Sequence, residues 1–435
     1  MASLPASTGA ARGHVPAWRQ VRWRILTLVF LVTVINFVHR QTLSVVAPVL
    51  REQLHLTNTD YGRIVSAFML GMMVGEFPVG WLMDRIGVRN GFSVSVAWWS
   101  LAAALHTFAG TVLQFSAARL SMGLGECGNF SGGMKVVAEW FPARERAFAV
   151  GVFNAGSMIG SLITPPLIVF IALHYGWRMA FLYPSFLGFL WVAAWRSAYR
   201  PLLDHRGVSA SERDHIRSGQ SPAGPPPANR DLLRQPPAWG LILCRFLVGP
   251  VIQFYWFWMP IYLYQTRGLT LAAIGLFSWI PYLFGDVGSV GGGWAAGRLM
   301  RRGMSLPRAR LTIMWAGAAC CALSVYVTLA PSAATAIGLI CLVMFGHTAL
   351  SANMFAAISD IFPDGAVGRV TGLTGIAGGI SGLLFPLLTG YLVDKLSFAP
   401  VFVIAGLLPA AGVLCLATMA AGFRRLAPGD FATIC

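Results

Sequence analysis

The chain has 435 residues, of which 56% are hydrophobic and only 11% are charged. This composition excludes a set of soluble domains and indicates an integral membrane protein. The formal net charge of +16 would suggest a nucleic-acid partner for a soluble protein. Here the basic residues lie in the loops between apolar segments, so we attribute them to membrane topology and expect no nucleic acid.

Apolar segments of membrane-spanning length follow one another along the chain. A hydrocarbon core about 30 Å thick requires roughly 20 apolar residues per helix. We therefore predict an all-α integral membrane fold with twelve transmembrane helices in a lipid bilayer. The apolar run after the N-terminal arginines continues without a small-residue cleavage site, which predicts an uncleaved first helix. The twelve segments are expected at residues 25–50, 62–83, 92–110, 112–134, 146–171, 178–197, 239–262, 273–297, 311–330, 333–357, 368–393 and 399–421.

One long polar stretch, rich in Ser and Pro, separates the sixth segment from the seventh. Its composition is typical of a flexible linker between two halves. The expected parts are an N-terminal tail (1–24), a six-helix half (25–198), the linker (199–238), a second six-helix half (239–421) and a C-terminal tail (422–435).

Basic residues are concentrated in alternate connections between the segments. Since cytoplasmic loops carry the excess of Lys and Arg, the linker and both tails are predicted to be cytoplasmic. We expect the membrane to be a cell membrane, the bacterial inner membrane. The basic connections contain Arg85, Arg89, Lys135, Arg144, Arg146, Arg196 and Arg200, the arginines of 298–310, Arg424 and Arg425.

An internal repeat relates the two halves. Residues 80–85 (GWLMDR) end the second segment, and residues 293–298 (GWAAGR) end the eighth. Glycines four residues apart also recur in segments five and eleven. Two parallel repeats are therefore expected, and close helix packing explains the glycines better than a ligand role.

Residues 80–89 (GWLMDRIGVR) resemble the signature of the major facilitator superfamily between its second and third helices. The resemblance implies the major facilitator fold, transport by alternating access, and a gating role for Asp84, Arg85 and Arg89. These side chains would pair across the two halves in one state and separate in the other. Asp360 is expected to act similarly in the second half.

A narrower resemblance is to the anion:cation symporter family, especially its hexuronate and galactonate branch. The residues that carry it include 36–44 (NFVHRQTLS), 119–126 (RLSMGLGE) and 139–146 (EWFPARER). It implies transport of a sugar acid or another small organic anion, commonly with protons. We expect the protein to be a monomer.

Few ionisable residues interrupt the apolar segments, where each costs at least about 2.5 kcal/mol. Arginines at this depth favour a carboxylate substrate, because the guanidinium fork matches a carboxylate. Arg245 and Asp286 are expected to form a structural pair. The set is His39, Arg40, Glu76, Arg119, Glu126, Arg245, Asp286 and His347.

Arg119 and Glu126 lie seven residues apart, or about 10 Å along one helix face, which excludes a direct pair. We expect Arg119 to bind the anion or a partner on another helix. Glu126 is expected to carry the proton, because burial favours the neutral form of a carboxyl group. The alternative for Glu126 is a structural polar contact between helices.

By the family resemblance, Arg40 would bind the substrate carboxylate rather than form a structural ion pair. The resemblance places an aspartate of the proton site just before that arginine, but this chain has His39. His39 either titrates or stays neutral and hydrogen-bonded. Glu76 is expected either to supply the missing carboxylate or to pair with Arg85 or Arg89.

Other polar and aromatic side chains are candidates to line a cavity, where they would hold a sugar ring. The alternatives are an interfacial aromatic belt and hydrogen bonding between helices. The substrate-binding candidates of this kind are Gln253, Tyr255, Trp256, Asn154, Ser157, His347, Asn353 and Thr374.

The function that these observations favour is a secondary active transporter that takes up a sugar-acid monocarboxylate with protons. Another organic anion, such as a dicarboxylate or an aromatic acid, is the first alternative. A proton-coupled exporter would carry an earlier Gly-Pro pattern than Pro165 and Pro166, and a receptor would need a signalling domain. The sequence has no nucleotide loop, metal-ligand set or paired nucleophile, so we expect no enzyme, cofactor or metal.

Overall fold

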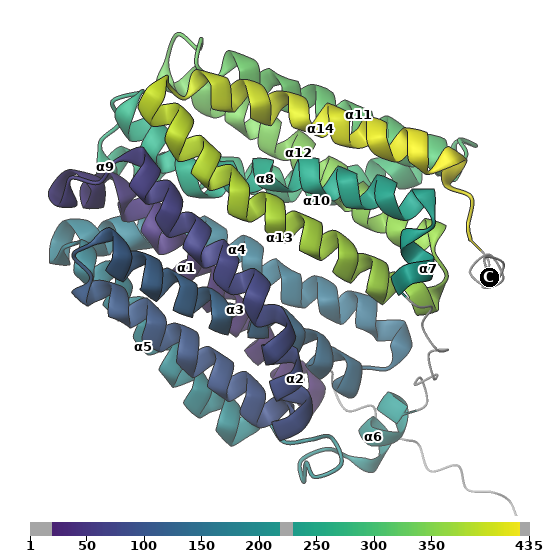
Figure 1. Cartoon of the computed structure of the whole chain (residues 1–435). Coiled ribbons are helices and arrows are strands. Elements are labelled where there is room, and N and C mark those ends of the chain that lie inside the picture. Colours follow the sequence, from purple (N-terminus) through teal and green to yellow (C-terminus); the bar gives the residue numbers. More distant parts are fainter. Residues whose placement is uncertain (1–19, 218–228, 427–435) are drawn as a thin grey trace, which may run out of the picture.

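The computed structural model describes residues 20–217 and 229–426, which are almost entirely helical (Figure 1). Helices α1 to α5 form one group of long helices, and α8 to α14 form a second group beside it. The first group consists of α1 (Val21–Leu54), α2 (Asn58–Leu105), α3 (Val112–Trp140), α4 (Ala143–Tyr175) and α5 (Trp177–Ala198). The second consists of α8 (Pro236–Gln265), α9 (Leu271–Phe277), α10 (Ile280–Arg301), α11 (Leu306–Ala322), α12 (Ala333–Ile361), α13 (Asp364–Lys395) and α14 (Ala399–Met419).

Within the described residues, nine helical stretches are long and apolar enough to cross a membrane. One of them, Asn58–Phe108, contains two of the predicted segments, joined at a sharp turn. Gly87 makes this turn with a φ of 78°, a conformation that glycine adopts without steric cost. Most of each predicted segment is helical, because long apolar runs are a local property of the chain, but the segment expected at 273–297 is divided between α9 and α10.

The two ends of the bundle are named here by the course of α1. The near end contains the start of α1 and the turn at Gly87, and the far end contains the end of α1 and the start of α2. Helices α2 and α3 approach closely between these ends, because a Cβ added to Gly71 or Gly123 would collide with the backbone of the other helix. Small residues at such crossings allow close packing in lipid.

The described part of the linker contains two short helices. Helix α6 (Ala210–Arg217) lies against the start of α1, and α7 (Asn229–Leu233) precedes α8. The carboxylate of Glu212 accepts hydrogen bonds from the backbone amides of Val21, at 3.4 Å, and Arg22, at 3.1 Å. An acidic side chain at a helix N-terminus is favourable, and the polar composition of the linker did not reveal this contact.

Candidate functional site

A central cavity of about 400 Å³ lies between the two groups of helices. Helices α1 to α4 line it on one side, and α8 and α13 line it on the other. Seven of the predicted substrate-binding and proton-coupling residues line this cavity, and they come from both groups. They are Arg40, Glu76, Glu126, Asn154, Ser157, Gln253 and Trp256.

Arg40 and Glu126 form an ion pair at the wall of the cavity. Both Nε and Nη2 of Arg40 lie 2.9 Å from Oε2 of Glu126. The Glu126 side chain is fully buried, and that of Arg40 is 14% exposed. Nη2 of Arg40 also donates to Oδ1 of Asn36 at 3.3 Å. Glu126, which was expected to titrate separately from Arg119, thus has Arg40 as its direct partner.

Arg119 is buried behind Arg40. Its Nη1 donates to the backbone carbonyl of Arg40 at 3.1 Å, and its guanidinium lies 5.6 Å from the ring centre of Phe68. Arg119 does not line the cavity in this conformation. It therefore supports the backbone that carries Arg40, and a direct contact with substrate stays a prediction.

Arg245 lines the cavity from the second group of helices, which the sequence did not predict. The expected Arg245–Asp286 pair is wrong, because no ion pair joins these two described residues and Asp286 lines a different pocket. The Arg245 guanidinium lies 5.0 Å from the ring centre of Phe355. It makes no hydrogen bond or ion pair to any described residue, so a cationic group lines the cavity without an anionic partner among those residues.

The remaining candidates are buried in helix contacts rather than in the cavity wall. Tyr255 shares a hydrogen bond of 2.8 Å with Ser324, and His347 lies 3.0 Å from the carbonyl of Val248. The others in this group are His39, packed near Gly188 on α5, Asn353, bonded to Arg310 at 3.2 Å, and Thr374, bonded to the carbonyl of Thr371 at 2.9 Å.

The far end of the bundle is held closed by a carboxylate that joins α13 to α2. Asp394 accepts hydrogen bonds from the backbone amides of Asn58 and Thr59 at 3.0 and 2.7 Å, and from their side chains at 2.8 and 2.6 Å. Tyr61 donates to the carbonyl of Phe257 at 2.7 Å in the same region. Asp394 was not among the residues predicted from the sequence, where its only signal was its position before Lys395 at the end of an apolar segment.

We expect an Asp394→Asn substitution to loosen the far end. A hydrogen bond to a charged group contributes about 1.5 to 3 kcal/mol, so loss of the charge should increase the far-end-open population about tenfold or more. Spin labels at Phe108 and Leu329, which lie on exposed surface in the two groups, would report a longer distance by pulsed electron paramagnetic resonance.

The matched control is Asp60→Asn, because Asp60 caps the same helix start but bonds to Thr57 of its own group. That control should leave the distance distribution unchanged. An Asp394→Asn protein with the parental distribution would contradict the sealing role of Asp394.

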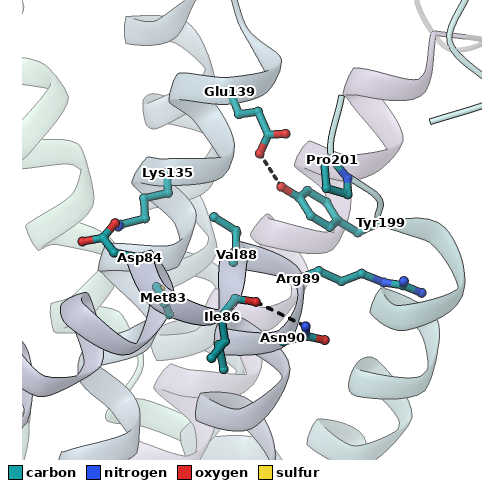
Figure 2. A pocket seen from close by; sticks show the side chains of 11 residues that line it. Met83, Asp84, Ile86, Val88, Arg89, Asn90, Lys135, Glu139, Tyr199 and Pro201 are labelled. Atoms are coloured by element: carbon teal, nitrogen blue, oxygen red, sulfur yellow. Dashed lines mark hydrogen bonds and ion pairs between the residues drawn. The ribbon is translucent and has the colours of Figure 1, made fainter. Parts of the chain in front are cut away.

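The predicted gating residues lie at the near end, where Asp84 and Arg89, but not Arg85, line a pocket of about 500 Å³ (Figure 2). Asp84 pairs with Lys135 of α3 rather than with a residue of the other group. Arg89 donates to the carbonyl of Arg196 on α5, and the Arg85 guanidinium lies 5.1 Å from the ring centre of Trp81.

The near end is more open than the far end. A Cβ added to Gly80 on α2 or Gly372 on α13 would meet no atom within 4 Å at the near end. At the far end, a Cβ added to Gly62 on α2 or Gly390 on α13 would collide with the backbone of the other helix. Glu76, exposed between this end and the cavity, makes no ion pair to any described residue. Its expected pairing with Arg85 or Arg89 is therefore not formed in this conformation.

Asp360, expected to act like Asp84 in the second half, pairs with Arg310 on α11 at 2.9 Å. Asp84 and Asp360 thus each pair with a basic residue of their own group of helices. No group of three or more His, Cys, Asp or Glu side chains that could hold a metal ion occurs in the described part of the chain.

Comparison with known proteins gives concordant matches. Residues 29–386 and 308–429 match the sequence profile described as Major Facilitator Superfamily. A hexuronate transporter of Escherichia coli K12 is 32% identical over 92% of this chain and 94% of its own length. A probable galactarate/D-glucarate transporter of the same strain is 28% identical over 93% and 96%. The crystal structure of a bacterial homologue of the lysosomal transporter Spinster is 18% identical, with a TM-score of 0.71 over 96% of this chain and 100% of that one.

Proposed function

We propose that this protein, which belongs to the Major Facilitator Superfamily, takes up a sugar acid together with protons by alternating access. The protein is a multi-pass membrane transporter and not an enzyme. The relatives named as hexuronate and galactarate/D-glucarate transporters support a sugar acid as the substrate.

Our proposal for the topology is that twelve helical passes form two halves, residues 25–198 and 239–421, with the linker and both tails in the cytoplasm. The near end is then cytoplasmic, and the structure is an inward-facing state. The positive-inside distribution of Arg and Lys supports this orientation. The hydrogen bonds of Asp394 at the far end support closure toward the outside.

The observation that carries the substrate proposal is the pair of arginines that face one cavity from opposite halves. Arg40 comes from α1 and Arg245 from α8. Guanidinium groups bind carboxylates through two parallel hydrogen bonds, and a cavity of about 400 Å³ has room for a sugar acid. A carboxylate held by both arginines would draw the two halves together during alternating access.

The proton coupling that we propose follows from competition for Arg40. Ionised Glu126 accepts a hydrogen bond from Nε of Arg40 and forms an ion pair with the same guanidinium. When Glu126 takes up a proton, Arg40 loses its anionic partner and becomes available to the substrate carboxylate. Binding of the anion and protonation of Glu126 therefore favour each other, which is the linkage that a symporter requires.

Gating is proposed to involve the near-end charges. In the outward-facing state this end must close, and Asp84, Arg85 and Arg89 lie on the turn that would meet the other half. The Asp84–Lys135 pair holds the acid within its own half while the near end is open.

Uptake by the purified protein in liposomes tests the function directly. We expect saturable uptake of hexuronates or aldonates that increases when the inside is made alkaline relative to the outside, because a proton gradient would then drive the anion inward. The panel would also include aldaric acids, other dicarboxylates and aromatic acids. Uptake confined to an aromatic acid would contradict a sugar-acid substrate, and uptake insensitive to the pH gradient would contradict proton symport.

A further inference from the structure

A second, smaller cavity of about 80 Å³ adjoins the central one. Phe37, Ser157 and Trp256 line both cavities, so the small one is a side pocket of the proposed binding site. Asp286 and Tyr282 from α10 complete its polar wall. Nothing in the proposed mechanism uses Asp286.

Asp286 has no partner in the described part of the protein. Its Oδ2 is buried and makes no hydrogen bond, and no ion pair includes it. An unpartnered carboxyl group inside a membrane protein is costly, so such groups usually face a pathway for substrate or ions. The position of Asp286 in a side pocket fits a group that arrives from the central cavity.

The chemistry of the pocket favours a neutral, hydroxylated ligand group. No Arg, Lys or His lines it, so nothing there can neutralise an anion. Ser161, which also lines the pocket, accepts a hydrogen bond from Gln41 at 2.8 Å and keeps its own proton to donate. Carboxyl, phenol and serine side chains together offer acceptors and donors to the hydroxyl groups of a polyol.

Arg40 and Arg245 line the central cavity, whereas Asp286 lines the adjoining side pocket. The Arg40 guanidinium lies 4.8 Å from the ring centre of Phe37, whose ring lies 5.9 Å from that of Trp256. Phe37 and Trp256 therefore separate the basic part of the cavity from the side pocket that contains Asp286. A substrate that lies along these rings would place its carboxylate at one end and a different group at the other.

We propose that Asp286 accepts hydrogen bonds from the hydroxyl groups at the end of the substrate remote from its carboxylate. Asp286 then selects sugar acids with one carboxylate over those with a carboxylate at each end, because no basic side chain lines the pocket to pair with a second carboxylate, which would instead meet the oxygens of Asp286. This inference rests on the proposed function and narrows its substrate class.

The test compares galacturonate, which has one carboxylate, with galactarate, which has two. In liposomes that contain the parental protein, galactarate should compete with galacturonate uptake at least tenfold more weakly than unlabelled galacturonate does. In Asp286→Asn, which removes the charge and keeps a polar side chain of the same size, competition by galactarate should strengthen at least tenfold. The half-saturation concentration for galacturonate should rise less than tenfold, because the amide still pairs with hydroxyl groups.

Two further variants make the test specific. Asp204→Asn changes an exposed aspartate outside the long helices and should keep the parental ratio of galactarate to galacturonate competition. Asp286→Ala, which also lacks the charge, should show the same shift as Asp286→Asn and replaces it if that protein fails to elute as a single species.

Each remaining outcome overturns the inference in a distinct way. A parental protein that takes up both acids equally, or Asp286 variants with the parental ratio, would remove Asp286 as the selecting group and leave the proposed function intact. Loss of gradient-driven uptake at an unchanged ratio would make Asp286 a proton carrier instead. A parental protein that takes up no sugar acid would overturn both this inference and the proposed function.

Discussion

A Glu126→Gln protein is expected to lose uphill uptake driven by a pH gradient and to keep exchange of substrate down its own gradient. The amide oxygen of the introduced glutamine side chain can still accept hydrogen bonds from Arg40, but the amide cannot take up or release a proton. With one proton carried per anion, a gradient of one pH unit supports about tenfold accumulation, since 1.4 kcal/mol corresponds to a factor of ten. Accumulation in the variant should fall to the level without a gradient, measured beside counterflow in the same liposomes.

His39→Asn is the informative comparison for this experiment. His39 is buried against α5 and does not line the cavity, so we expect the His39→Asn protein to retain gradient-driven uptake. Asp204→Asn, in an exposed position, should behave as the parent. Full accumulation in Glu126→Gln would remove Glu126 as the carrier. Loss of gradient-driven accumulation in His39→Asn alone would make His39 the proton carrier. Full accumulation in both variants would leave Glu76 as the next candidate.

The second large effect is expected from lysine at the two cavity arginines. Arg40→Lys and Arg245→Lys keep the positive charge but lose the fork that binds a carboxylate through two bonds. Substrate affinity should fall at least about tenfold in each, because a hydrogen bond to a charged group contributes about 1.5 to 3 kcal/mol. The measurement is competition in counterflow with a confirmed substrate.

The two lysine variants differ in one respect that separates binding from coupling. Arg40 bonds to Glu126, whereas Arg245 has no ion-pair partner in the described residues. Arg40→Lys should therefore alter the pH dependence of uptake as well as affinity, and Arg245→Lys should alter affinity alone. Arg200→Lys, at an exposed site, is the control. Parental affinity in both cavity variants would show that these arginines do not hold the carboxylate.

The family and the helical segments could be predicted from sequence because their signals are local. An apolar run such as 25–50 must become a helix in a membrane, since only intrahelical hydrogen bonds satisfy its backbone there. It does so in α1. Residues 80–89 likewise contain the turn at Gly87. The presence of arginines and carboxyl groups inside apolar segments was equally readable, because each is an exception to the local pattern.

Only the tertiary structure decided which of these charges meet. The seven-residue spacing correctly excluded an Arg119–Glu126 pair, but it could not identify Arg40, 86 residues away, as the partner of Glu126. Asp394 binds the start of α2 across 336 residues, and Arg245 faces the cavity while Asp286 lies in the side pocket. Helix periodicity places a side chain on one face of its own helix. The rotation and crossing of neighbouring helices, which determine what that face meets, depend on the packing of side chains that are distant in sequence.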